Sequence, residues 1–588
     1  MKYRSAKKWD ALNESRSLLY FSQIMEEMLF DFSLDTYKPS VMHTGLLVNE
    51  ALQTIEEVEA GNIKEPNIGH VIGELIQFLE RDPIAASLIK LPLASVLSIL
   101  KNPKAGKQNT KSTLEILSVQ VSKNKYRLEC ERLLAKAIKE GGSQSELRRL
   151  SRSYATSMVA CGFTQKHLLD ATKSFFYHDH NRIGGNEAID EFLAKFPSSP
   201  HKYTIIFKVD AILKNSAPAL LPVGLSISQS LPEAFNSPNH KNFLKLGENE
   251  LYGYIDDIES FDWGGARNYA ERIIRLSATL LNLFHHKKDP SWSSDCLAIN
   301  KTTGEKKIVS RPINPMRRCT DLVEAAASQR LQAFASTFSL ERDSFVKFIR
   351  SSQLHSLALA SQNEENQILN LWIALESLVP SESKSENSSN IEHIVSSITP
   401  FLNEGYIQGL LNNLVKDLLR WDREALHGAL DGVPGRRFVD RLARLLTLKE
   451  FEIKREELEA NCRRFPLLSD RLEYFKSTLA SPKSVLAAID AHQERLEWQI
   501  RRIYRARNII VHSGRIPSYT HPLIEHAHNY LDTVLDRLVK LASTPKQVHS
   551  VAQGFKFTEI RYKSFRNALE VRDLKFTKDN IEELLFDF

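Results

Sequence analysis

One segment near the C-terminus concentrates side chains that can bind a phosphate or move a proton. It reads LEWQIRRIYRARNIIVHSG over residues 496–514, and no acidic residue occurs between Glu497 and Glu525. Five arginines fall within fifteen residues, namely Arg501, Arg502, Arg505, Arg507 and Arg515. A local positive field of this kind favours the binding of a polyanion. His512 adds an imidazole, which titrates near neutral pH and can act as a general acid or base.

The periodicity of this segment predicts an amphipathic helix. At about 100° per residue, one apolar stripe is expected to be buried, consisting of Leu496, Ile500, Ile503, Ile510 and Val511. The far face carries four polar side chains at i, i+4, i+7 and i+11, which are Arg501, Arg505, Asn508 and His512. Gly514 is predicted to end the helix, so His512 lies in the last turn, where the helix dipole favours its protonated form.

Arg507 falls in the centre of the apolar stripe, where an unpaired guanidinium is costly. Either a carboxylate meets it or the stripe borders a second subunit. Glu376, on the predicted helix 365–379, is the best-placed acid. A purely structural alternative remains open, in which Arg507 and Glu376 pair to hold two helices together and His512 is an ordinary helix-end residue.

Two stretches resemble a known family. Residues 507–512 have the R-N-x-x-x-H form of the Rx4-6H motif of HEPN ribonucleases, and Trp372-Ile-Ala-Leu-Glu376 resembles the first helix of the Apea-like HEPN group. The resemblance covers about 346–545. It implies RNA cleavage without a metal or cofactor, in which the ribose 2′-hydroxyl attacks the adjacent phosphorus and leaves a 2′,3′-cyclic phosphate and a 5′-hydroxyl.

The resemblance also assigns roles. His512 would be the general acid/base, Arg507 would stabilise the phosphorane, and Asn508 would orient the phosphate or the histidine, with Glu376 in support. The other arginines are predicted to bind RNA: Arg501, Arg502, Arg505 and Arg515. The resemblance implies that such a site forms between two copies of the chain. On one ideal helix Arg507 and His512 point about 140° apart, so either unwinding at Gly514 or a second subunit must bring them together. A homodimer or higher homo-oligomer is therefore expected.

The family further implies a biological setting. HEPN nucleases often serve as effectors in antiphage defence or toxin–antitoxin systems, where they cut tRNA or mRNA. A phage-derived or cognate regulatory partner would then control the nuclease, and residues 1–345 would sense the trigger or restrain the activity. The alternative is a catalytically inactive HEPN-like bundle that serves as a dimerisation or nucleotide/RNA-binding module in a scaffold protein.

The amino-acid composition limits which fold classes can contain residues 496–514. Of the 588 residues, 42% are hydrophobic and 26% charged, which is ordinary for a globular chain of several domains. Glycine and proline together make up only about 8%, which favours helix over a turn-rich all-β fold. No apolar run reaches the roughly 18 residues of a membrane span, and no apolar signal core follows the basic start. We expect a cytoplasmic protein without a membrane contact.

The predicted fold is mainly α, in four parts. Residues 1–200 read as a helical N-terminal region. Residues 201–345 read as a mixed α/β module, with strands at 202–213 and 250–263 and a hairpin turning at Thr303-Gly304. Residues 346–545 read as the HEPN-like bundle, and residues 546–588 as a tail with a strand-like segment at 555–565.

Three other groups of residues are weaker candidates. His178, Asp179 and His180 have HxH spacing, which occurs in metal hydrolases, but no second ligand cluster follows and we interpret them as a polar helix exit. Arg420 and His427 form a second Rx6H, interrupted by acids and interpreted as a helix end. The five cysteines are odd in number and far apart, so neither a disulfide framework nor a cysteine zinc site is expected.

Overall fold

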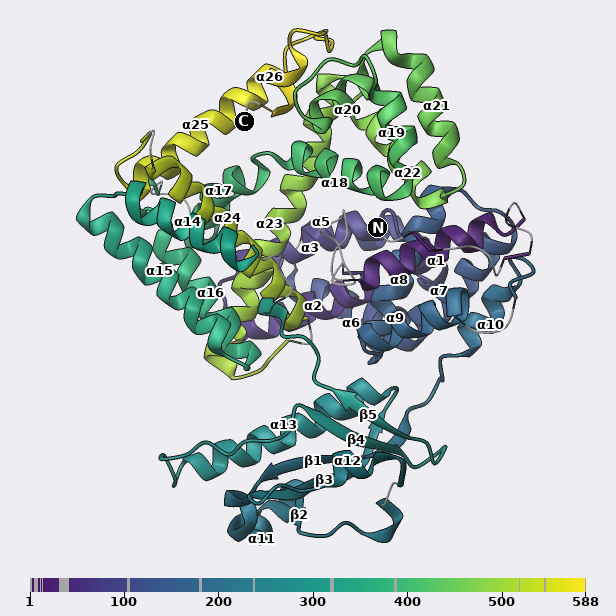
Figure 1. The fold of residues 1–588 in the computed structure, drawn as a ribbon, viewed down its shortest axis with the longest axis vertical. Coiled ribbons are helices and arrows are strands. Elements are labelled where there is room, and N and C mark those ends of the chain that lie inside the picture. The colour runs from purple at the N-terminus through teal and green to yellow at the C-terminus, as the bar shows by residue number, and fades with distance from the viewer. Residues whose placement is uncertain are drawn as a thin grey trace.

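The protein consists of a large helical body and a smaller lobe built on a β-sheet (Figure 1). The computed structural model describes residues 3–4, 9–10, 12, 14–30, 42–102, 106–178, 182–235, 238–317, 322–384, 389–517, 519–543 and 546–586. Helices dominate, and one antiparallel sheet of five strands lies in the middle of the chain, as the sequence predicts.

The sheet has the strand order β2-β3-β1-β4-β5, and every pair is antiparallel. Its strands are β1 (His201–Asp210), β2 (Ser226–Ser228), β3 (Glu250–Ser260), β4 (Asp295–Asn300) and β5 (Lys306–Ser310). The lobe also contains α11 (Ala217–Leu220), α12 (Lys241–Leu244) and α13 (Trp263–Asn282). The two predicted strands and the hairpin are confirmed, and Gly304 has the positive φ of 75° that a tight turn needs.

Alternation along β1 gives the lobe its two layers. Ile205 and Phe207 are fully buried in the core that the sheet shares with α13. Ile206, between them, is buried in a small cluster on the opposite face. Asp262 caps α13 by accepting a hydrogen bond from Gly265 N at 2.8 Å. Alternate apolar side chains of β1 are therefore buried on both faces of the sheet.

The helical body has two main hydrophobic cores. The first is formed by the N-terminal helices, which are α1 (Arg16–Leu29), α2 (Thr44–Glu59), α3 (Pro66–Leu79), α4 (Pro83–Leu88), α5 (Leu93–Lys101), α6 (Lys107–Gln120), α7 (Lys123–Lys139), α8 (Gln144–Cys161), α9 (Gln165–Lys173) and α10 (Ala188–Ala194). Later helices complete this core, namely α18 (Tyr406–Trp421), α19 (Arg423–Leu430), α20 (Phe438–Thr447), α21 (Glu452–Cys462) and α22 (Pro466–Thr478), with α26 (Ile581–Phe586).

The second core belongs to a bundle of C-terminal helices. They are α14 (Glu324–Thr337), α15 (Arg342–Ala360), α16 (Glu364–Leu378), α17 (Asn390–Asn403), α23 (Pro482–Ser513), α24 (Thr520–Ala542) and the start of α25 (Val551–Leu569). The segment predicted as one bundle, 346–545, is therefore divided, because α18–α22 pack on the N-terminal helices instead. Tyr20 Oη donates to Asp470 Oδ2 at 2.8 Å across that junction.

The predicted strand at 555–565 is wrong, since these residues lie in α25. The apolar residues alternate locally, but the buried positions are Phe555, Thr558 and Tyr562, which recur every three or four residues. Two cores lie beside this helix, so packing along a helical stripe buries more of it than a single exposed strand could.

Two further predictions from the sequence concern membrane-spanning segments and the pairing of cysteines. None of the described helices combines the length and the apolar character needed to cross a bilayer. The four described cysteines are unpaired, and the fifth, Cys319, lies outside the described residues.

Three histidines are held inside the helical body without charge. His43 stacks on Tyr126 with ring centroids 4.0 Å apart, and His492 stacks on Tyr406 at 3.6 Å. Burial lowers the pKa of both imidazoles to about 3. Burial and the charge of Arg501 lower the pKa of His70 to about 4. Since an unfolded histidine has a pKa near 6.5, the unfolded chain binds protons that the native chain does not.

We therefore expect the free energy of unfolding to fall as the pH drops from about 6.5 towards 4. Each such histidine adds a slope of about 1.4 kcal/mol per pH unit in that window. His492→Gln should remove one of these slopes. Urea unfolding followed by circular dichroism, at several pH values between 7 and 4, measures the difference between wild type and variant. An identical pH dependence for the two proteins would contradict this assignment.

Candidate functional site

The predicted functional segment lies at the C-terminal end of α23, the longest helix of the structure at 32 residues. Ser481 caps its start by accepting a hydrogen bond from Ser484 N. Gly514, with a φ of 64°, ends it and donates from its backbone N to Ile510 O. The helix and its glycine stop are confirmed, and His512 lies in the last turn.

The apolar stripe of α23 packs into the second core, where it meets α16, α17 and α24. Its buried members are Leu496, Ile500, Ile503 and Ile510. Val511 departs from the prediction, because its side chain is 48% exposed. The ring of Trp372 on α16 lies 5.5 Å from that of Tyr504, so the first stretch that resembles the HEPN family contacts α23 three residues before residues 507–512 begin.

Arg502 and Arg505 do not face solvent, and the prediction that they bind RNA is wrong. Arg502 donates from Nε to Glu50 Oε2 at 2.9 Å and from Nη2 to Glu74 Oε2 at 2.5 Å. Arg505 donates from Nη2 to Glu50 Oε1 at 2.5 Å. The four residues are at most 5% exposed. We name them the buried ion cluster, in which α2 and α3 supply the acids.

The electrostatics of the buried ion cluster follow from these contacts. Burial raises the pKa of Glu50, but the guanidiniums of Arg502 and Arg505 outweigh it and lower that pKa overall. Among the described residues Glu74 forms a hydrogen bond with Arg502 alone, and burial raises its pKa. Glu50 is thus the charged acid on which both arginines depend. The cluster joins the N-terminal helices to α23.

Arg501 is also engaged by acids. It donates from Nε to Glu392 Oε1 at 3.0 Å and from Nη2 to Glu392 Oε2 at 2.9 Å, and reaches Glu497 Oε2 at 3.1 Å. His70 Nε2 lies 3.3 Å from the same Glu392. The side chain of Arg501 is 13% exposed, so its predicted RNA contact is not supported. Arg515 is exposed and forms no ion pair with any described residue.

Arg507 and Asn508 are brought together. Arg507 Nη1 donates to Asn508 Oδ1 at 2.9 Å, whereas its Nε is buried and has no hydrogen-bond partner. The suggested pair with Glu376 does not form, because Glu376 accepts a hydrogen bond from Trp372 Nε1 at 3.1 Å. Among the described residues no carboxylate neutralises Arg507. The guanidinium therefore has one N–H that is not used in a hydrogen bond.

His512 is exposed, and among the described residues no hydrogen bond links it to Arg507 or Asn508. Exposed apolar side chains flank it, with Val511 at 48% and Ile516 at 47%. In one copy of the chain, the end of α23 thus carries the exposed imidazole of His512. On another face it carries the guanidinium of Arg507, whose Nε–H has no hydrogen-bond partner. Together these groups can bind a phosphate and exchange a proton, provided that a second surface brings them to one point.

The weaker candidates do not form a site in the described residues. His178 ends the short π-helical turn Ser174–His178, while Asp179 and His180 lie outside the described residues. Arg420 lies 3.8 Å from Asp417 in α18, and His427 on α19 packs edge-on against Phe438. Asp422, which lies between Arg420 and His427 in the sequence, caps the start of α19. Both histidines are helix-end residues.

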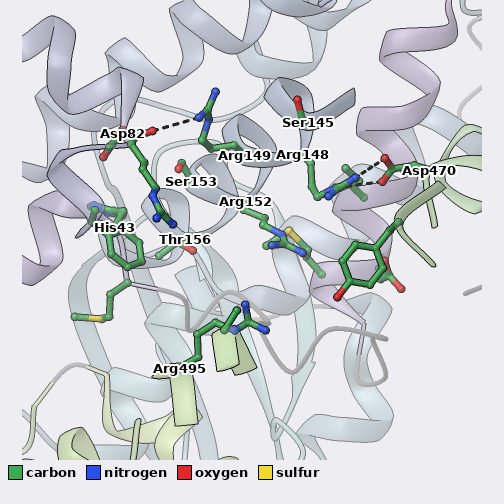
Figure 2. Close-up of a pocket in the computed structure, with 18 of the residues that line it drawn as sticks. His43, Asp82, Ser145, Arg148, Arg149, Arg152, Ser153, Thr156, Asp470 and Arg495 are labelled. Carbon is green, nitrogen blue, oxygen red and sulfur yellow. Dashed lines mark hydrogen bonds and ion pairs between the residues drawn. The ribbon is translucent and has the colours of Figure 1, made fainter. Parts of the chain in front are cut away.

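A feature that the sequence analysis missed is a cavity of about 610 Å³ between α1–α3, α7 and α8 on one side and α18, α22 and the first half of α23 on the other (Figure 2). Its wall carries six arginines: Arg81, Arg148, Arg149, Arg152, Arg471 and Arg495. Three come from RRLSR on α8, at i, i+1 and i+4. That basic run was visible in the sequence, but the segments facing it lie up to 350 residues away.

Some of these charges are compensated and some are not. Arg148 binds Asp470, and Arg471 binds Asp417 and Glu27. Arg149 donates only to the carbonyl oxygen of Arg81 at 3.3 Å among the contacts of described residues. The wall also holds planar rings, which are Phe78, Tyr126, Tyr406, Tyr474, Phe475 and Trp498. Guanidiniums beside aromatic rings suit a flat, anionic ligand.

The buried ion cluster can be tested by removing one charge. In Glu50→Gln, Arg502 keeps Glu74 but Arg505 loses its carboxylate partner, so we expect the free energy of unfolding to fall by about 3–5 kcal/mol. The matched control is Glu392→Gln, whose side chain is 37% exposed and should cost about 1 kcal/mol or less. Urea unfolding at pH 7 compares the two, and equal losses would refute the structural role of the cluster.

The chain matches no known protein-family model, and neither a curated protein nor a solved structure is significantly similar to it. The resemblance to HEPN ribonucleases therefore depends on two short motifs, whose helices α16 and α23 pack together in the bundle.

Proposed function

We propose that the chain is a metal-independent endoribonuclease of the HEPN type. The observation that carries the proposal is the state of the two key side chains at the end of α23. His512 is exposed, and Arg507 has an unsatisfied Nε and no carboxylate partner among the described residues. A purely structural pair would instead bury the imidazole or neutralise the guanidinium with an acid.

In the proposed reaction an imidazole accepts the proton of a ribose 2′-hydroxyl, and the 2′-oxygen bonds to the neighbouring phosphorus. The bond from phosphorus to the 5′-oxygen then breaks, and an imidazolium gives its proton to the leaving oxygen. The products are a 2′,3′-cyclic phosphate and a 5′-hydroxyl. Arg507 stabilises the charge that builds on the phosphorane, and Asn508 holds the guanidinium through the 2.9 Å hydrogen bond.

The proposed site is shared between two copies of the chain. On one helix Arg507 and His512 point about 140° apart, so they cannot both reach one phosphate. Val511 and Ile516 expose apolar surface beside His512, which supports a contact with a second copy at this end. Two helix ends facing each other would supply one imidazole as base and the other as acid.

The proposed substrate and setting follow the family resemblance. The RNA would be tRNA or mRNA, cut in antiphage defence or in a toxin–antitoxin system. Because three of the clustered arginines bind acids of the same chain, RNA contact near the site depends on Arg507 and Arg515. The positive patch open to RNA is therefore smaller than the sequence implies.

Cleavage of a labelled single-stranded RNA in the presence of EDTA tests the proposal. We expect His512→Ala to lower the cleavage rate at least about 100-fold, as loss of general acid–base catalysis does, and Arg507→Ala to do the same. His427→Ala is the matched control, since His427 is an exposed histidine at another helix end. Cleavage that survives both substitutions, with products lacking the cyclic phosphate, would refute the site.

A second candidate function is the binding of a phosphate-bearing nucleotide in the cavity of Figure 2. The observation in its favour is a pair of buried polar atoms in the wall, His43 Nε2 and Thr156 Oγ1, which have no hydrogen-bond partner. Gly45 N donates to His43 Nδ1, so the uncharged imidazole carries its proton on Nε2. His43 Nε2 is therefore an unused hydrogen-bond donor in the wall that also carries the arginines of α8. This agrees with a nucleotide-binding or sensing role for the N-terminal region.

Isothermal titration with AMP and with inorganic phosphate tests this candidate. We expect AMP to bind more tightly than phosphate, because the rings of the wall add stacking, and Arg81→Gln combined with Arg149→Gln to weaken binding at least about tenfold. Arg572→Gln is the control, because its side chain is 95% exposed and lies in the turn after α25. No measurable AMP binding, or unchanged binding in the double variant, would reject the candidate.

A further inference from the structure

Two helices of the C-terminal bundle bring two histidines and an aspartate to one point. His355 comes from α15, whereas His528 and Asp532 lie one turn apart on α24. His355 Nε2 is 3.3 Å from Asp532 Oδ1, and His528 Nε2 is 3.3 Å from Asp532 Oδ2. The three potential ligand atoms all lie within 4.8 Å of one another.

The contacts differ from those of a hydrogen-bonded ion pair. His355 Nε2 is buried and forms no hydrogen bond, although a carboxylate oxygen lies only 3.3 Å away. The ring planes of the two histidines are 33° apart, with centroids separated by 4.9 Å. A buried nitrogen that points near an acid without bonding to it leaves a polar group unsatisfied, which is costly unless something else binds it.

We propose that His355, His528 and Asp532 bind a divalent metal ion, with Zn²⁺ as the ion that fits best. Zinc prefers imidazole nitrogen and carboxylate oxygen at about 2.0–2.1 Å in tetrahedral geometry, and the ligand atoms of such a tetrahedron are about 3.3–3.4 Å apart. Both nitrogen–oxygen separations in the protein have that length. The two contacts end on different oxygens of Asp532, Oδ1 for His355 and Oδ2 for His528, so small side-chain rotations are needed for all three residues to bind one ion.

The site leaves one coordination position free. The side chain of His528 is 4% exposed, that of His355 is 19% exposed and that of Asp532 is 43% exposed, so the cluster opens to solvent on the aspartate side. Three protein ligands with an accessible fourth position are the arrangement of a zinc ion that also binds water or a small ligand. A metal ion bound by these residues would also link α15, through His355, to α24, through His528 and Asp532.

The inference does not depend on the proposed ribonuclease chemistry, which uses no metal. The sequence analysis missed this cluster because His355 is 173 positions away from His528 along the chain. The only local signal was a histidine and an aspartate four residues apart on one helix, which is common in bundles without any metal.

The test uses the full chain, stripped with a chelator and dialysed into metal-free buffer. Titration with ZnCl₂ should give one ion per chain, and Co²⁺ should give the intense visible absorption of a tetrahedral site. Asp532→Asn and His355→Ala should each weaken Zn²⁺ binding at least about tenfold. Their side chains are partly exposed, so both variants should still fold, which circular dichroism checks.

The control is His526→Ala, which removes another histidine of α24 and should leave the stoichiometry unchanged. Wild-type protein that binds no Zn²⁺ at micromolar concentrations would overturn the proposal. So would equal binding by the wild type, Asp532→Asn and His355→Ala. RNA cleavage in EDTA is measured separately, so that loss of the metal site and loss of the nuclease proposal give different results.

Discussion

The packing of the N-terminal helices on α23 depends on two acids and two arginines that are buried where these helices meet. Glu50 and Glu74 project from α2 and α3 onto Arg502 and Arg505. A charge that has lost its water is tolerated only beside its opposite. The paired side chains therefore hold α2 and α3 in a defined position on α23, and α23 contributes residues to both hydrophobic cores of the body.

The same constraint limits what α23 can offer to a ligand. Three of the arginines that look free in the sequence bind acids of the same chain, and they serve folding rather than recognition. What remains exposed in the last turn is His512, whereas Arg507 is half-buried and its unbonded Nε is buried. A small reactive group at the end of a firmly held helix is well suited to chemistry that needs fixed positions.

The helix also connects distant parts of the protein. Arg495 and Trp498 lie in the wall of the cavity, and the same helix continues to His512. A ligand that fills the cavity would contact α8, α18, α22 and α23 together.

The sequence by itself determined most local elements: the helical character of the body, the strand β1, the hairpin at Gly304 and the amphipathic α23 with its glycine stop, but not α25, whose residues 555–565 were predicted as a strand. Hydrophobic periodicity and backbone chemistry are properties of neighbouring residues, so they are readable without a fold. Only the tertiary structure decided that Arg502 and Arg505 are buried against Glu50 and Glu74, that α18–α22 leave the bundle, and that His355 meets His528. Those outcomes depend on which distant segments exclude water from each other, and spacing along the chain carries no information on that.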